Sequence, residues 1–175
     1  EVRMKTFFAN RVAGCSAHPD RYGFALYVNH WQTADRALEL DVGDDEKPCH
    51  HKSSGPNAFQ YGKWMHVALI VDVNDDDNTI TYSAYVDKKM KITMQLTHRR
   101  NVKSHYPLRV GAHNDNQHGF IGNVSEISVW SHAMRTSHDL SKLLNDCFVN
   151  VEVGEITEQL MKQTLGFYVA TGEKS

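Results

Sequence analysis

The sequence predicts an all-β fold of two antiparallel sheets arranged as a sandwich, and three observations support this prediction. Residues 120–130 alternate like one long strand with polar and apolar side chains on both faces, which is typical of a strand within layered sheets. Residues 64–73 carry apolar side chains on both faces, which predicts a central strand. Gly, Pro, Asn and Asp residues separate the strand-like segments, as expected for turns.

The elements follow from the periodicity of the sequence. Alternation predicts strands over 2–9, 22–29, 36–42, 64–73, 79–86, 90–96, 108–112, 119–130 and 165–170. Helical spacing predicts short helices near 136–145 and 156–163, both close to the C-terminus. With 175 residues, of which 41% are hydrophobic and 23% charged, the chain is long enough for one substantial core. We therefore expect a single domain over residues 1–175.

Charge and hydropathy limit the classes of partner. The net charge is −2 with mixed signs, so we expect no binding to nucleic acid. No run of about 18 apolar residues occurs, so we expect no direct membrane insertion by this chain. The chain begins at Glu1, and its first residues alternate like a strand instead of forming a signal peptide. We therefore expect a fragment of a larger multidomain protein.

Five segments, in this order, resemble one superfamily. They are Tyr61–Asp72 with a Gly-x-Trp-x-His-Val-Ala pattern, Tyr82–Asp87, Leu108–Ala112, Phe120–Trp130 with a Phe-x-Gly-x-x-x-Glu-x-x-x-Trp pattern, and Leu165–Val169. Together they resemble the laminin-G-like and pentraxin-like jelly rolls of the concanavalin A-like lectin/glucanase superfamily. The resemblance implies a jelly-roll sandwich closed by the last strand. It also favours an extracellular or cell-surface location.

Antiparallel order predicts which loops share one end of the fold. If strands cross in alternating directions, loops 10–21, 43–63, 87–89 and 113–118 meet. This end collects most of the Cys and His residues of the loops, together with Asp44, Asp45, Asn114 and Asp115. Our candidate ligand-binding residues are His113, Asn114, Asp115 and His118 from this end, and Trp31 from the 30–35 loop.

Two of the three cysteines lie in loops that share this end. Cys15 and Cys49 can reach the Cα separation of a disulfide, about 5.5 Å, if their loops touch, so we predict a bridge between them. Cys147 then has no partner within the chain. A zinc site is the alternative, although the paired spacing of a zinc motif is missing. Its candidate ligands are Cys49, His50, His51, His113 and His118.

The resemblance also implies calcium, because many relatives hold Ca²⁺ with oxygen ligands from their loops. The candidate calcium ligands are Asp44, Asp45, Asn114 and Asp115. Ser125 stands where the family often has an Asp, directly before the Glu of the Phe-x-Gly strand. The chain departs from the calcium-binding pattern at that position.

One segment offers an enzymatic alternative. Glu39-Leu40-Asp41-Val42-Gly43-Asp44 resembles the Glu-x-Asp-x-x-Glu strand of laminarinase-like glycoside hydrolases. Alternation places Glu39 and Asp41 on one face, as a retaining hydrolase needs. Asp44, however, stands where these enzymes have a Glu, and its shorter side chain follows Gly43. We therefore expect no catalytic residues and no enzymatic activity.

The sequence is best explained as a non-catalytic recognition or adhesion module. Its partner is expected to be a protein, or the chain serves as a scaffold within a larger protein, because no aromatic cluster lies in the polar loops. The alternative is a carbohydrate-binding lectin domain, with or without calcium, in which Trp31 stacks on a sugar.

Overall fold

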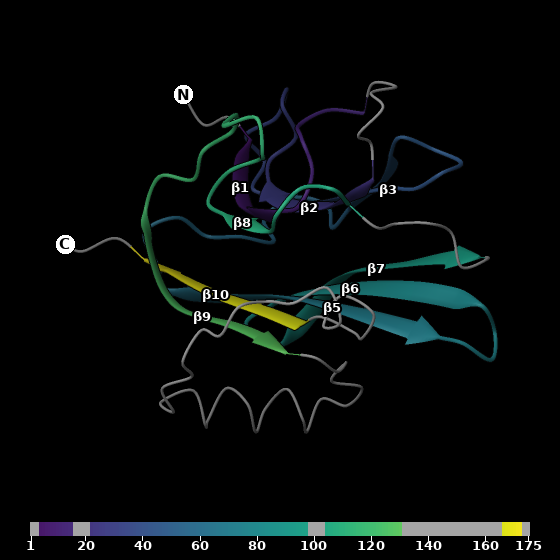
Figure 1. The fold of residues 1–175 in the computed structure, drawn as a ribbon. Coiled ribbons are helices and arrows are strands. Elements are labelled where there is room, and N and C mark those ends of the chain that lie inside the picture. The colour runs from purple at the N-terminus through teal and green to yellow at the C-terminus, as the bar shows by residue number, and fades with distance from the viewer. Residues whose placement is uncertain (1–3, 16–21, 98–103, 131–165, 173–175) are drawn as a thin grey trace. The chain divides into compact units, whose positions relative to one another are not determined.

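The computed structural model describes residues 4–15, 22–97, 104–130 and 166–172. The chain divides into two compact units: unit 1 is Glu1–Gly62 with Arg99–Gly122, and unit 2 is Lys63–His98 with Asn123–Ser175. Each unit holds one five-stranded sheet (Figure 1). The single domain over 1–175 stays a prediction.

All strand pairings in the described residues are antiparallel, which confirms the predicted all-β class with two antiparallel sheets. The described residues form no helix. The helices predicted near 136–145 and 156–163 lie outside them.

The sheet of unit 1 has the order β4-β3-β2-β1-β8. Its strands are β1 (Lys5–Ala9), β2 (Gly23–Val28), β3 (Leu38–Gly43), β4 (His50–Ser53) and β8 (Arg109–Val110). Strand β3 shows how the two faces differ: Leu38, Leu40 and Val42 are fully buried on one face, while Glu39 and Asp41 alternate with them on the other. The first face is a hydrophobic core, and the second carries polar groups that are also buried.

The sheet of unit 2 has the order β7-β6-β5-β10-β9. Its strands are β5 (Met65–Asn74), β6 (Thr79–Val86), β7 (Lys89–Thr97), β9 (Asn123–Trp130) and β10 (Gly166–Gly172). Strands β5, β6 and β7 follow one another, whereas β10 lies between β5 and β9 (Figure 1). Strand β5 is therefore central, and Val67, Ala68, Leu69 and Ile70 are buried on both of its faces, as predicted for this segment.

One strand was missed by the sequence prediction. Residues 43–63 were expected to form a single loop, but β4 interrupts them and pairs with β3. Residues 44–49 therefore stay at the end of the sheet with the 10–15 loop, while residues 54–62 follow the opposite end of β4. The sequence His50-His51-Lys52-Ser53 has no apolar alternation, because β4 is a short and largely exposed edge strand.

Candidate functional site

Four side chains from three neighbouring strands meet on one face of the unit 1 sheet, which we call the polar face. Tyr27 of β2 lies opposite Glu39 of β3, and His51 of β4 lies opposite Asp41 of β3. Directly paired residues point to the same side of a sheet, so Tyr27, Glu39, Asp41 and His51 share this face. Only His51 is substantially exposed, with 41% of its side-chain area accessible.

Asp41 is the centre of a hydrogen-bond network. Its Oδ2 accepts a hydrogen bond of 3.0 Å from the Tyr27 hydroxyl, and its Oδ1 lies 2.7 Å from Nδ1 of His51. Burial raises the pKa of Tyr27, and the negative charge of Asp41 raises it further, so this hydroxyl stays a neutral donor. The hydrogen bond to Asp41 raises the pKa of His51.

Glu39 is less well satisfied than Asp41. Its Oε1 accepts a hydrogen bond of 3.0 Å from Ser53 Oγ, and its Oε2 lies 3.3 Å from Nε2 of His51. Oε2 is buried and has no hydrogen-bond partner among the described residues. Burial raises the pKa of the Glu39 carboxyl. His51 therefore lies between two buried carboxylates.

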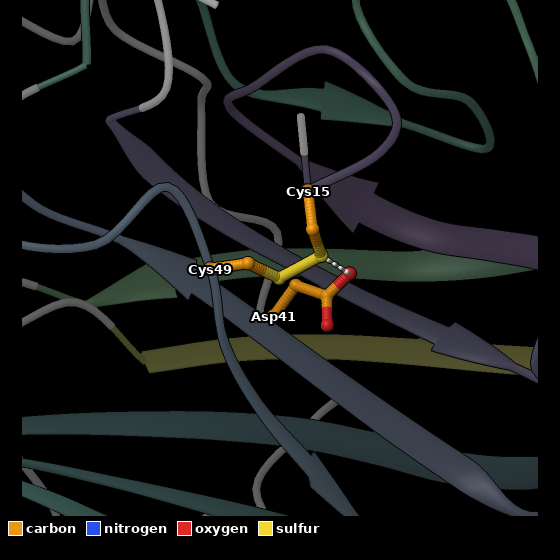
Figure 2. A group of neighbouring side chains, drawn as sticks. All are labelled: Cys15, Asp41 and Cys49. Atoms are coloured by element: carbon orange, nitrogen blue, oxygen red, sulfur yellow. Dashed lines mark hydrogen bonds between the residues drawn. A yellow bond between two sulfur atoms is a disulfide. The ribbon is translucent and has the colours of Figure 1, made fainter. Parts of the chain in front are cut away.

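The predicted disulfide between Cys15 and Cys49 is present, with a Cα separation of 5.0 Å. Figure 2 shows the Asp41 carboxylate beside it, with Oδ2 at 3.9 Å from Sγ of Cys15. The two sulfurs and Asp41 bring three potential ligand atoms within 4.8 Å of one another. The bonded sulfurs are not thiolates, however, and the zinc alternative therefore loses Cys49 while the disulfide is intact.

Arg11 ties the loops around the disulfide together. Its Nη2 donates to the carbonyl oxygens of Gly14 at 2.8 Å and Pro48 at 2.9 Å. The side chain is fully buried, and Nη1 has no hydrogen-bond partner among the described residues. Burial lowers the pKa of Arg11, although the charge of Asp41 opposes this effect.

The predicted meeting of polar loops is observed within unit 1. The amide of Asn114 donates to the Arg11 carbonyl at 3.1 Å, and the amide of Ala13 donates to Oδ2 of Asp115 at 3.1 Å. Together with the disulfide, these contacts join the loops 10–15, 44–49 and 113–118. Residues 87–89, predicted to join them, belong to unit 2.

His113, one of the predicted ligand-binding residues, is buried. It is 2% exposed, and its Nδ1 lies 2.7 Å from Oγ1 of Thr6. Burial, together with the neighbouring His118, lowers the pKa of His113 to about 4. The ring centroids of His113 and His118 are 5.7 Å apart. The His113 ring is thus buried and neutral near pH 7, and ligand binding by His113 stays a prediction.

Three of the four candidate calcium ligands, Asp44, Asn114 and Asp115, form hydrogen bonds with other groups of unit 1. Oδ1 of Asp44 accepts from the amides of Glu46 at 3.0 Å and Lys47 at 2.7 Å, and its Oδ2 lies 2.8 Å from Nε2 of His50. The Asn114 amide group donates to the carbonyl of Pro107 at 3.1 Å. Asp45 is exposed. Calcium binding by Asp44, Asp45, Asn114 and Asp115 stays a prediction.

Trp31 belongs to a second candidate site, formed by exposed large side chains on two ordered loops. We define the aromatic loop surface as Trp31, Arg36 and Tyr61, all of which are exposed. Buried Asn29 connects Tyr61 and Arg36, because its Nδ2 donates to the Tyr61 hydroxyl at 2.8 Å and its Oδ1 accepts from the Arg36 amide at 2.7 Å. Trp31 is 59% exposed.

Sequence reasoning found Trp31 but missed Arg36 and Tyr61. It also placed Glu39 and Asp41 on one face without predicting that His51 lies between them. The position of His51 depends on the register of β4 against β3. Residues 50–53 show no periodicity from which this register could be predicted.

Comparison with known proteins agrees with this architecture. A family model described as the concanavalin A-like lectin/glucanases superfamily matches residues 5–138, more than half of the chain. The chain therefore belongs to the concanavalin A-like lectin/glucanase superfamily. No curated protein and no solved structure matches the chain. In the described part of the chain, no helix is long and apolar enough to cross a membrane.

Proposed function

We propose that the chain is a non-catalytic recognition module of an extracellular or cell-surface protein and that it binds a protein partner through the aromatic loop surface. The observation that carries this proposal is the exposure of Trp31, Arg36 and Tyr61 on hydrogen-bonded loops. Trp, Tyr and Arg are the residues most enriched among those that dominate binding energy at protein interfaces. Loops that are already ordered lose little conformational entropy on binding.

The positions of the carboxylates support a non-catalytic role. In the hydrolase-like pattern the third carboxylate is Asp44, which is fully buried and accepts hydrogen bonds from two backbone amides of its own turn. Such a group organises the loop before Cys49 and does not reach a sugar. The disulfide also favours an oxidising, extracellular compartment.

A second candidate function is carbohydrate binding, favoured by a row of planar rings near the polar face. The ring centroids of Trp31 and His30 are 5.9 Å apart, and those of His30 and His51 are 5.7 Å apart. Planar rings stack on sugar faces, and polar groups beside them accept hydrogen bonds from hydroxyls.

Affinity capture and a glycan array test both functions with the same pair of variants. Trp31→Ala removes the most exposed ring of the aromatic loop surface. Trp64→Ala is the matched control, since Trp64 is similarly exposed, at 52%, but belongs to unit 2. Capture of one protein by wild type and Trp64→Ala, but not by Trp31→Ala, supports protein recognition.

Array binding with the same dependence on Trp31 supports the lectin function instead. If Trp31→Ala retains full binding to whatever the wild type binds, the aromatic loop surface is not the recognition site.

A further inference from the structure

The two nitrogens of His51 have different environments. Nδ1 lies 2.7 Å from Oδ1 of Asp41, and a carboxylate can only accept, so Nδ1–H is the donor. In the neutral ring this leaves a lone pair on Nε2, which lies 3.3 Å from Oε2 of Glu39. Two acceptors then lie side by side, an arrangement that is favourable with a proton or a metal ion between them.

The burial of Glu39 is a second observation at the same contact. Glu39 is 3% exposed, and its Oε2 has no hydrogen-bond partner among the described residues. A buried carboxylate oxygen without a partner costs several times the free energy of an ordinary lost hydrogen bond.

We propose that Oε2 of Glu39 and Nε2 of His51 bind one divalent transition-metal ion of the Zn²⁺ or Co²⁺ type. With metal–ligand bonds of about 2.0–2.1 Å, neighbouring ligands of a tetrahedral ion lie roughly 3.4 Å apart. The observed 3.3 Å between these two atoms fits that edge. Asp41 then plays the part of the carboxylate that commonly orients a metal-binding histidine through its other nitrogen.

The proposed site is open to solvent on one side. His51 is partly exposed on the edge strand β4, which gives the ion a route of entry. His30 is the nearest further imidazole, with its ring centroid 5.7 Å from that of His51. It does not join Glu39 and His51 within a single 4.8 Å group of ligand atoms in the described residues, so water completes the shell.

A nitrogen ligand favours zinc and its neighbours over calcium. The site therefore differs from the predicted calcium ligands, and it goes beyond the proposed recognition function, which needs no metal.

Titration of the oxidised chain with CoCl₂ and ZnCl₂ tests this proposal. A Cys147→Ser background removes the remaining thiol, and prior dialysis against EDTA removes adventitious metal. We expect one equivalent of Co²⁺ to bind with visible d–d absorption and Zn²⁺ to displace it. Glu39→Gln and His51→Gln should each weaken binding at least ~10-fold, and Asp41→Asn about 10- to 100-fold.

His50→Gln is the matched control, because His50 is the adjacent imidazole on β4 and also faces a carboxylate, that of Asp44 at 2.8 Å. It should bind Co²⁺ as the wild type does. Circular dichroism establishes that each variant is folded. His51→Gln changes a partly exposed edge residue, and it decides the question if Glu39→Gln does not fold. Absence of Co²⁺ binding, or unchanged binding by His51→Gln, overturns the proposal.

Discussion

The sheets of the two units differ in how deeply the residues on their polar faces are buried. In unit 1, every residue of β2 and β3 is buried, including Glu39 and Asp41. In unit 2, strand β6 alternates regularly, with Ile80, Tyr82, Ala84 and Val86 buried and the uncharged residues between them half-buried. The pattern of β6 is typical of a sheet with one core face, whereas β3 places carboxylates where they lose most of their hydration.

The buried carboxylates of unit 1 need compensating partners, and the polar face of β6 has no such requirement. Buried carboxylates destabilise a fold unless hydrogen bonds or cations compensate, and unit 1 supplies Tyr27, Ser53 and His51 for that purpose. Among the residues of unit 2 whose burial the structure describes, no carboxylate is buried. We therefore expect perturbations of unit 1 to have larger effects on stability than equivalent changes in unit 2.

Loss of the disulfide should have the largest effect. The bridge closes a loop with a sequence separation of 34 residues, so the double substitution Cys15→Ser and Cys49→Ser should lower the free energy of unfolding by about 3–4 kcal/mol. Urea denaturation measures this change. Cys147→Ser leaves the bridge intact and is the control. A double variant as stable as that control would show that the loops of unit 1 are held together without the disulfide.

Protonation of His113 should have the next largest effect. Its pKa is about 4 in the folded chain, below the ordinary histidine value of 6.5 that applies to the unfolded chain, so the unfolded state takes up the proton first. The contribution of neutral His113 to the free energy of unfolding is complete above pH 6.5 and is lost as the pH falls towards about 4. That loss is on the order of 3 kcal/mol.

His113→Gln removes this titration. Urea denaturation across this pH range should show the stability difference between wild type and variant shrinking as the pH falls. A difference that stays constant over the range would mean that His113 does not titrate as proposed.

The smallest expected effect compares one chemical change in both sheets. Tyr27→Phe removes the donor to the buried Asp41 and should cost about 1–3 kcal/mol. Tyr85→Phe makes the same change on the half-buried face of β6 and should stay within about 0.5 kcal/mol. Thermal denaturation of both variants gives the comparison. Equal losses of stability in the two variants would show that a hydroxyl contributes as much on the half-buried face of β6 as beside the buried Asp41.

Much of the fold could be predicted from the sequence, because the alternation of side chains along a strand is a local property. The strand over 79–86 was predicted with the observed bounds, because its side chains alternate between a core and a partly exposed face. Antiparallel order also placed the loops of Cys15, Cys49 and Asn114 at one end of unit 1. Strand β4 escaped prediction, because a polar edge strand of four residues carries no periodic signal.

The candidate sites were predicted only in part. Trp31 was singled out from its place in a polar loop, but its exposure depends on how Asn29 fixes the loop against Tyr61. His113 was predicted as a ligand-binding residue of a polar loop, and the structure shows that it is buried against Thr6. Burial of a loop residue depends on distant segments that no local pattern describes.

The sequence by itself determined the class of protein, the positions of most strands and the pairing of loops at one end of unit 1. These properties follow from alternation and strand direction, which act between neighbouring residues. Only the tertiary structure decided that His51 lies between Glu39 and Asp41. That contact depends on the register of β4 against β3, and a shift of one residue would turn His51 to the other face of the sheet.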